Sequence, residues 1–149
     1  MIGIMKIYLD NCCYNRPYDD QSQIRINLEA QAKMGIQDMI AEGKVDLVSS
    51  FILRYENNRK KNQMVRDRID SFIERYSSGY IDGTSGPKVL TMASGYMKKG
   101  LDPMDSAHIA CAVLAGCNYF ITVDDGVLKH RIDGIEIIDP VQFIRIRGE

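Results

Sequence analysis

The chain has 149 residues, of which 45% are hydrophobic and 26% charged, and 19 basic against 20 acidic residues give a net charge of −1. This length and composition are typical of one globular domain over residues 1–149, which buries roughly 68–70% of the surface of its unfolded chain. The charge balance excludes nucleic-acid binding driven by bulk charge, although it allows a local basic patch.

The sequence shows no sign of membrane insertion or export. No apolar stretch approaches the ~18 residues that span a bilayer. Residues 1–10 lack the basic, apolar and small-residue regions of a signal peptide. The four cysteines form no CxxC pair and no metal-type spacing with histidine, which favours reduced thiols. We therefore expect a cytoplasmic protein that does not bind membranes.

Strand and helix patterns alternate along the chain, with glycine or proline near most of the boundaries. In chain order we expect a strand at 5–9, a helix over 22–42, a strand at 45–49, a long helix over about 51–76, a short strand at 79–81, a helix entered at 84–87, a nearly all-apolar helix over 104–115, strands at 118–123 and 134–138, and a short helix from 140. Strands separated by helices predict an α/β fold of three layers, α/β/α, with a central parallel sheet of about five strands.

Four acidic residues lie where the chain leaves an expected strand or enters an expected helix. Asp10 and Asp124 follow strands, while Glu56 and Asp105 lie early in helices. Ligands of such sheets bind outside the carboxyl ends of the strands, so the fold class itself predicts that these side chains meet. Carboxylates gathered closely repel one another unless a cation joins them, and oxygen ligands suit Mg²⁺ or Mn²⁺. We therefore expect a metal site.

Each acidic residue also has an ordinary structural explanation. Asp10 and Asp124 could form turns after strands, and Glu56 could be an exposed helix residue paired with a neighbouring lysine or arginine. Asp105 is the most informative, because the helix that it opens is too apolar for the surface. An ionised carboxylate buried there is costly unless it is paired or binds metal. Its ordinary explanation is that it complements the helix dipole from the first turn, but Asp102 could do this as the N-cap without Asp105.

The order of these motifs carries a family resemblance. The segment DSAHIA over 105–110 is followed by an alanine-rich helix and then by YFITVD, which ends at Asp124. This order resembles the D-A-x-x-I-A…T-x-D block of the PIN-domain family of metal-dependent ribonucleases. The opening YLDNCC…NRP resembles the family's first strand and aspartate. The resemblance extends over nearly the whole chain, although the long middle helices carry few motif residues.

The resemblance implies a ribonuclease that hydrolyses RNA phosphodiester bonds with Mg²⁺ or Mn²⁺. Many family members are toxins that a small antitoxin protein holds inactive, so the resemblance also allows an antitoxin partner. The family's metal ligands and catalytic residues, acting directly or through water, would correspond here to Asp10, Glu56, Asp105 and Asp124.

Neighbouring polar residues have less certain places in this scheme. Asp125 could support or replace Asp124. The family carries a small hydroxyl residue shortly after the first aspartate, where this chain has Asn11 and two cysteines. Asn11 could take that polar role, and Ser49 or Ser50 could supply a hydroxyl. His108 lies three residues after Asp105, on a similar helix face, and is either a donor to the site or a packed core residue.

An RNA substrate requires cations to meet its phosphates. The one basic concentration is RYENNRKKNQMVRDR over 54–68, which begins beside Glu56, and Arg16 lies near another strand end. The alternative for this segment is an ordinary solvated helix face. The expected substrate-binding residues are Asn11, Arg16, Arg54, Arg59 and Lys60.

Two other functions compete with the nuclease. A PIN-fold protein without turnover could serve as an RNA-binding or scaffold module, although the presence of all four acids argues against it. A phosphoryl-transfer domain of receiver or haloacid-dehalogenase type also places an aspartate after its first strand. The phosphatase type requires a second aspartate two residues later, where this chain has Cys12. Exposed faces on the long helices would also suit a homodimer.

Overall fold

The structure, a computed structural model, describes residues 4–147 of the chain. One sheet of five parallel strands lies at its centre, in the order β3-β2-β1-β4-β5. The strands are β1 Met5–Leu9, β2 Val45–Ser50, β3 Ser77–Ile81, β4 Tyr119–Ile121 and β5 Glu136–Ile138. The predicted α/β class and the five-stranded parallel sheet are confirmed. This order also differs from the 2-1-3-4-5 order of receiver domains, which argues against that alternative.

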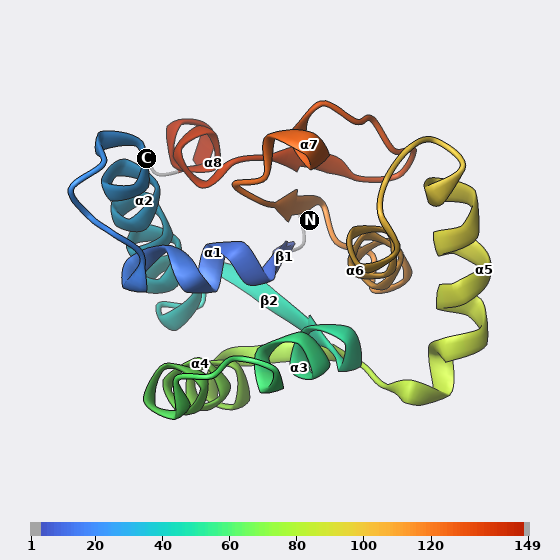
Figure 1. Cartoon of the computed structure of the whole chain (residues 1–149), viewed down its shortest axis with the longest axis horizontal. Coiled ribbons are helices and arrows are strands. Elements are labelled where there is room, and N and C mark those ends of the chain that lie inside the picture. The colour runs from blue at the N-terminus through green and yellow to red at the C-terminus, as the bar shows by residue number, and fades with distance from the viewer. Residues whose placement is uncertain (1–3, 148–149) are drawn as a thin grey trace.

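Helices cover both faces of the sheet, as the three-layer prediction requires. The helices of the described residues are α1 Asn11–Asn15, α2 Ile24–Ala41, α3 Phe51–Asn58, α4 Gln63–Tyr76, α5 Gly86–Met97, α6 Pro103–Leu114, α7 Asp125–Leu128 and α8 Pro140–Arg147. Figure 1 shows α2, α4 and α8 on one side of the sheet, with α6 and then α5 on the other. Among residues 4–147, no helix combines the length and the apolar character that a bilayer crossing requires.

The central strand β1 is buried by neighbours on every side. Its residue Ile7 pairs with Leu47 of β2 and with Tyr119 of β4. Tyr8 is fully buried and stacks on Phe120, with ring centroids 5.5 Å apart. Strands covered on both faces are apolar throughout rather than alternating, which explains the run of apolar residues in β4.

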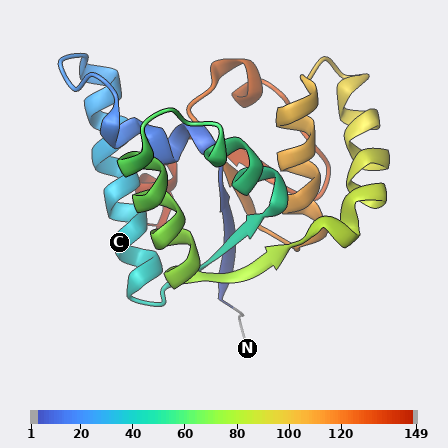
Figure 2. The ribbon, with the colours of Figure 1, turned by 60° about the horizontal axis from the view of Figure 1, so that its bottom comes forward.

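All the carboxyl ends of the strands face one edge of the sheet. Figure 2 shows β1 running from the N-terminus up to α1, which begins directly after the strand. Helices α1, α3 and α7 gather at this edge, each at the end of a strand or just beyond it. The two short helices α1 and α7 do not follow from helical periodicity, because each is only four or five residues long and begins at an aspartate cap.

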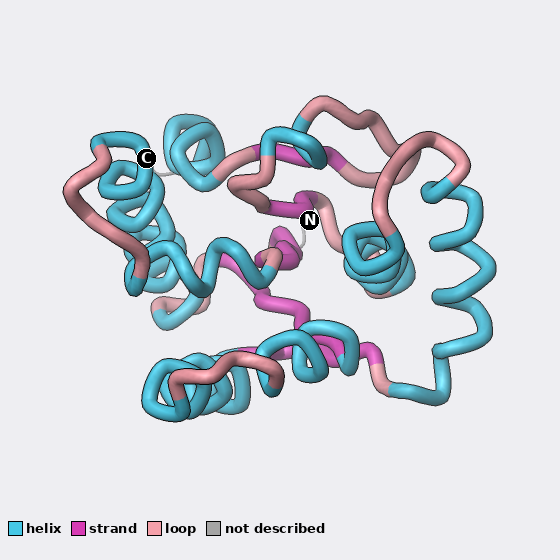
Figure 3. The backbone as a smooth tube through the Cα atoms, viewed as in Figure 1, coloured by secondary structure: helices cyan, strands magenta, loops and turns pink. Residues whose placement is uncertain are grey.

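The prediction of one helix over 51–76 is wrong, because the chain forms α3 and α4 with a loop between them. Figure 3 shows this loop, in pink, between the two cyan helices. Asn62 ends the loop as the cap of α4, since its side chain accepts a hydrogen bond from the backbone of Val65 at 3.1 Å. Asparagine competes with the helix for backbone hydrogen bonds, which favours a break at this position.

The junction of α3 and α4 is held by Asn57, whose side chain is fully buried. Its amide nitrogen donates to the Asp70 carboxylate at 2.7 Å and to the Arg66 carbonyl at 3.2 Å. Its amide oxygen accepts from Lys60 Nζ at 2.7 Å. This one side chain therefore joins the two helices and the loop between them.

We expect Asn57→Ala to lower the free energy of unfolding by about 2–3 kcal/mol, because it leaves buried polar partners unsatisfied. Asn58→Ala is the matched control, since Asn58 is the next residue and is exposed. That variant should stay within about 0.5 kcal/mol of the wild type. Chemical denaturation measures both values, and equal losses would contradict the role given to Asn57.

Candidate metal centre

The four acids predicted to converge line a single hollow at the carboxyl edge of the sheet. The hollow has a volume of about 310 Å³ and receives side chains from α1, α3, α6 and the segments beside them. Asp102, expected only as a helix cap, is a fifth carboxylate in its wall. The lining residues are Asp10, Asn11, Cys12, Asn15, Glu56, Asp102, Met104, Asp105 and Asp124.

Asp10 lies at the centre of this site and is almost completely buried. Its Oδ1 accepts a hydrogen bond from the backbone of Asn11 at 2.8 Å, and its Oδ2 accepts one from Thr122 Oγ1 at 2.8 Å. The thiol of Cys12 lies 3.4 Å from the same Oδ2. Burial raises the pKa of Asp10, while these hydrogen bonds act in the opposite direction.

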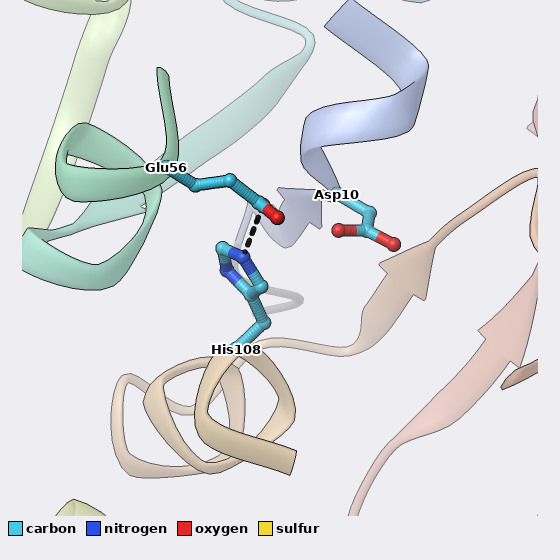
Figure 4. A group of neighbouring side chains, drawn as sticks. All are labelled: Asp10, Glu56 and His108. Atoms are coloured by element: carbon cyan, nitrogen blue, oxygen red, sulfur yellow. Dashed lines mark hydrogen bonds and ion pairs between the residues drawn. The ribbon is translucent and has the colours of Figure 1, made fainter. Parts of the chain in front are cut away.

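Glu56 reaches the hollow from α3 and faces Asp10 across it. Figure 4 shows the two carboxyl groups with the ring of His108 beside Glu56. Ligand atoms of these three residues all lie within 4.8 Å of one another. The Glu56 Oε1 is 2.8 Å from His108 Nε2. Glu56 is therefore not paired with a lysine or arginine, which was the ordinary explanation for it.

Asp105 experiences the accumulated negative charge most strongly. It lies in the first turn of α6, half-buried, with Asp102 as the cap of the same helix. Burial raises the pKa of Asp105 to about 7, and the charges of Asp10, Asp102 and Asp124 contribute in the same direction. Such a carboxyl group binds a proton unless another cation takes its place.

Asp124 is exposed at the rim and caps α7, since its Oδ1 accepts a hydrogen bond from the backbone of Gly126 at 2.8 Å. Asp125 does not line the hollow and contacts Arg25 instead. Both of its carboxylate oxygens lie 2.8 Å from the guanidinium of Arg25. This ion pair lowers the pKa of Asp125 and argues against a role in place of Asp124.

The predicted substrate-binding residues differ in whether they lie at the acidic hollow. Lys60 Nζ lies 2.6 Å from Asn11 Oδ1, so these two residues meet beside the hollow. Arg16 is 2.9 Å from both Asp19 and Glu29, which neutralise its charge. Arg54 lines a different hollow, together with Asp70 and Glu74.

Arg59 does not line the acidic hollow, and its guanidinium lies 5.8 Å from the ring centroid of Tyr55. Only Asn11 and Lys60 of the predicted set therefore lie at the acidic site.

Hydroxyl groups near the site come from residues that the sequence pattern barely marks. Thr122 supplies the hydroxyl that contacts Asp10, and its position in the T-x-D block was the available signal. Ser50 contacts Tyr8 rather than the hollow. His108 combines both roles that were open for it, because it is fully buried and also bonded to Glu56.

The residues present fit a divalent cation of the hard type. Five carboxylates line one small hollow, where burial and then the charges of its neighbours raise the pKa of Asp105. Mg²⁺ and Mn²⁺ prefer oxygen ligands and would relieve this repulsion. The side chains that could hold the ion are Asp10, Glu56, Asp105 and Asp124, with Asp102 beside them.

Comparisons with known proteins show which fold this is. Neither the protein-family models nor the curated protein sequences gave a match. The chain has the PIN-domain fold, as its sequence resemblance predicts. The crystal structure of VapBC2 from Rickettsia felis, bound to a DNA fragment from its promoter, contains a similar chain. The TM-score is 0.59 at 14% identity, over 91% of this chain and 98% of that one. The crystal structure of FitAcB from Neisseria gonorrhoeae also contains a similar chain. Its TM-score is 0.53 at 15% sequence identity, over 90% of this chain and 97% of that one.

The raised pKa of Asp105 predicts a pH-dependent stability. The folded, metal-free protein keeps a proton on Asp105 that the unfolded chain releases between pH 3.8 and about 7, so this group's contribution to stability falls as pH rises through that window. Asp105→Asn removes the ionisation. At pH 8 the variant should be more stable than the wild type by about 1–2 kcal/mol, a value reduced because Asp105 is half-exposed.

Thermal unfolding between pH 4.5 and 8 measures this difference, with the exposed Asp67→Asn as control. Addition of Mn²⁺ at pH 8 should stabilise the wild type and the control more than Asp105→Asn. A difference between Asp105→Asn and the wild type that does not grow with pH would contradict the assignment.

Proposed function

We propose that the chain is a metal-dependent ribonuclease that hydrolyses RNA phosphodiester bonds. The observation that carries this proposal is the hollow lined by five carboxylates at the carboxyl edge of a PIN-type sheet. Burial and the charges crowded there raise the pKa of Asp105, so its ionised form is unfavourable in the folded protein without a cation. A cation bound in the hollow would neutralise these carboxylates and attract the phosphate of a substrate, which explains why they are gathered there.

A bound Mg²⁺ or Mn²⁺ would supply Lewis-acid stabilisation of the phosphoryl charge and lower the pKa of water. The chain's own residues provide the frame for in-line attack. Asp10, held by three donors, fixes the centre of the site, and Asp105 and Asp124 face it from α6 and the end of β4. Glu56 or Asp124 would accept the proton of the attacking water. The water oxygen would bond to phosphorus as the bond from phosphorus to the leaving oxygen breaks. The leaving oxygen would take up a proton from solvent, which gives one phosphate monoester and one hydroxyl.

RNA is the proposed substrate because the family resemblance implies it, and because the basic segment 54–68 includes Glu56 and the second half of α3. Within this segment the structure favours Lys60 as a phosphate contact. Its ammonium group lies beside Asn11 at the hollow, and burial lowers its pKa. Arg16, Arg54 and Arg59 remain predictions that RNA crosslinking would test.

A small antitoxin is the proposed partner. VapBC2 was determined bound to a DNA fragment from its promoter. The present chain has a net charge of −1, which provides no bulk electrostatic attraction to DNA, so in a similar assembly we expect a second protein to supply the DNA contacts. Inspection of the gene immediately upstream, and co-expression with it if it is a short reading frame, followed by purification of a complex, would test this partner. The cytoplasmic location and the homodimer also remain predictions. Analytical ultracentrifugation, which gives the mass of the protein in solution, would test the homodimer.

Asp105→Asn is expected to lower Mn²⁺-dependent cleavage of RNA by roughly 10²-fold or more, because it removes a carboxylate from the cation site. Asp67→Asn, a change of the same chemistry at an exposed position, should cleave like the wild type. Cleavage of a fluorescent single-stranded RNA measures both. A wild-type protein that binds RNA without cutting it at any Mn²⁺ concentration would support the inactive RNA-binding or scaffold module instead.

Lys60→Met is expected to lower kcat/KM for RNA by roughly tenfold and to reduce the salt dependence of binding by about one unit of slope, because one phosphate contact is lost. Methionine keeps the apolar stem that is partly buried. Lys61→Met is the matched control, since Lys61 is the next residue and is exposed. Equal effects from both substitutions would show that Lys60 has no special place at the site.

A further inference from the structure

Glu56 belongs to a chain of hydrogen bonds that starts and ends on α3. The backbone N–H of Leu53 donates to Ser50 Oγ at 3.1 Å, which caps the helix. Ser50 Oγ lies 2.6 Å from Tyr8 Oη, and Tyr8 Oη lies 2.7 Å from His108 Nδ1. The chain closes with the 2.8 Å contact between His108 Nε2 and Glu56 Oε1.

When Glu56 is ionised, the hydrogen between His108 and Glu56 is fixed, and for a neutral ring the remaining hydrogens of the chain follow from it. A carboxylate can only accept, so the hydrogen between His108 and Glu56 lies on Nε2. In the neutral ring Nδ1 is then an acceptor, so the Tyr8 hydroxyl donates to it. The Tyr8 oxygen in turn accepts from the Ser50 hydroxyl, whose oxygen already accepts from Leu53. All four hydrogen bonds point the same way, toward Glu56.

The other tautomer does not satisfy these groups. A hydrogen on Nδ1 alone would place the lone pair of Nε2 against a Glu56 oxygen at 2.8 Å. The Tyr8 hydroxyl would have to turn toward Ser50. The Ser50 hydroxyl would then lose Tyr8 as its acceptor and, among the described residues, could donate only to the Cys111 sulfur, which is a weaker acceptor. Unsatisfied buried groups of this kind are costly, and His108, Tyr8 and Ser50 are all fully buried.

We propose that His108 is a positioning residue of this site: its Nε2–H, fixed as a donor by Tyr8 and Ser50, holds the Glu56 carboxylate toward Asp10 and is not itself a metal ligand. The proposal rests on the nuclease function proposed above. Figure 4 shows the arrangement, with the ring of His108 directed at Glu56 and Asp10 on the other side of that carboxylate.

This role accounts for how a flexible side chain is held at a half-exposed place. Glutamate has three rotatable bonds, and the Glu56 side chain keeps 29% of its exposure. The bond from His108 engages Oε1. Within residues 4–147 the structure shows no hydrogen bond to Oε2, which leaves that oxygen to face water or a cation. Outer residues that orient a ligating carboxylate typically contribute 10–100-fold to metal affinity or activity.

The tautomer is measured directly by long-range ¹H–¹⁵N NMR. The chain has two histidines, so His130→Gln assigns the signals of His108. We expect a hydrogen on Nε2, both without metal and with Mg²⁺. A hydrogen on Nδ1 alone, or loss of the Nε2 hydrogen when Mg²⁺ is added, would overturn the proposal in favour of a histidine ligand. This measurement needs no catalytic activity, so it is separate from the test of nuclease function.

Three variants test the effect on Glu56. His108→Leu removes the donor, and we expect kcat to fall and the Mn²⁺ dissociation constant to rise by roughly 10–100-fold, with KM for RNA little changed. His108→Gln restores an N–H donor and should recover most of both losses. Tyr8→Phe keeps the ring that stacks on Phe120 but removes the hydroxyl that fixes the tautomer. It should show a smaller loss than His108→Leu.

Circular dichroism and thermal unfolding show whether each variant is folded. If His108→Leu does not fold, Tyr8→Phe and His108→Gln decide the outcome by the same measurements. Folded variants that bind Mn²⁺ and cut RNA like the wild type would overturn the proposal. A wild type that binds Mn²⁺ without cutting RNA would refute the proposed function alone, because the effect of the variants on Mn²⁺ affinity would still test His108.

Discussion

The hydrogen bond from Thr122 to Asp10 joins the two strands on which the site depends. Asp10 directly follows the central strand β1, and Thr122 directly follows its neighbour β4, so the bond exists only when these strands are paired in register. Two further donors, Asn11 and Cys12, come from the helix turn that Asp10 itself caps. A nearly buried carboxylate is therefore tolerated because its oxygens accept hydrogen bonds on both sides.

The charges of the molecule are arranged so that this edge stays negative. Arg16 and Arg25 pair with acids outside the hollow, in particular Glu29 and Asp125. Lys60 lies nearest to the hollow among the basic residues predicted to bind RNA, but its ammonium group bonds to asparagines rather than to a carboxylate. The protein therefore gives up some stability at the site, which is common where a group must bind a charged ligand.

Much of the fold and the convergence of the acids followed from the sequence, because the order of strands and helices and the position of carboxylates at strand ends are local features. The helix break at 59–62 did not, since it depends on the buried side chain of Asn57 rather than on apolar spacing. The sequence could not predict the hydrogen bond between Glu56 and His108, because these residues are 52 positions apart. Likewise, the ion pair between Arg16 and Glu29 could not be predicted, because it depends on contacts that form only in the folded protein.

The strand order has a consequence for synthesis. The first half of the chain contains β1 and β2, but Asp105, Thr122 and Asp124 all belong to the last third of the sequence. Translation proceeds from the N-terminus, so Asp10 is made long before the residues that complete its surroundings. If the hollow cuts RNA as proposed, an unfinished polypeptide is harmless to the messenger that encodes it. Activity would then begin only after the segment that carries Asp105, Thr122 and Asp124 has been made and has folded against β1.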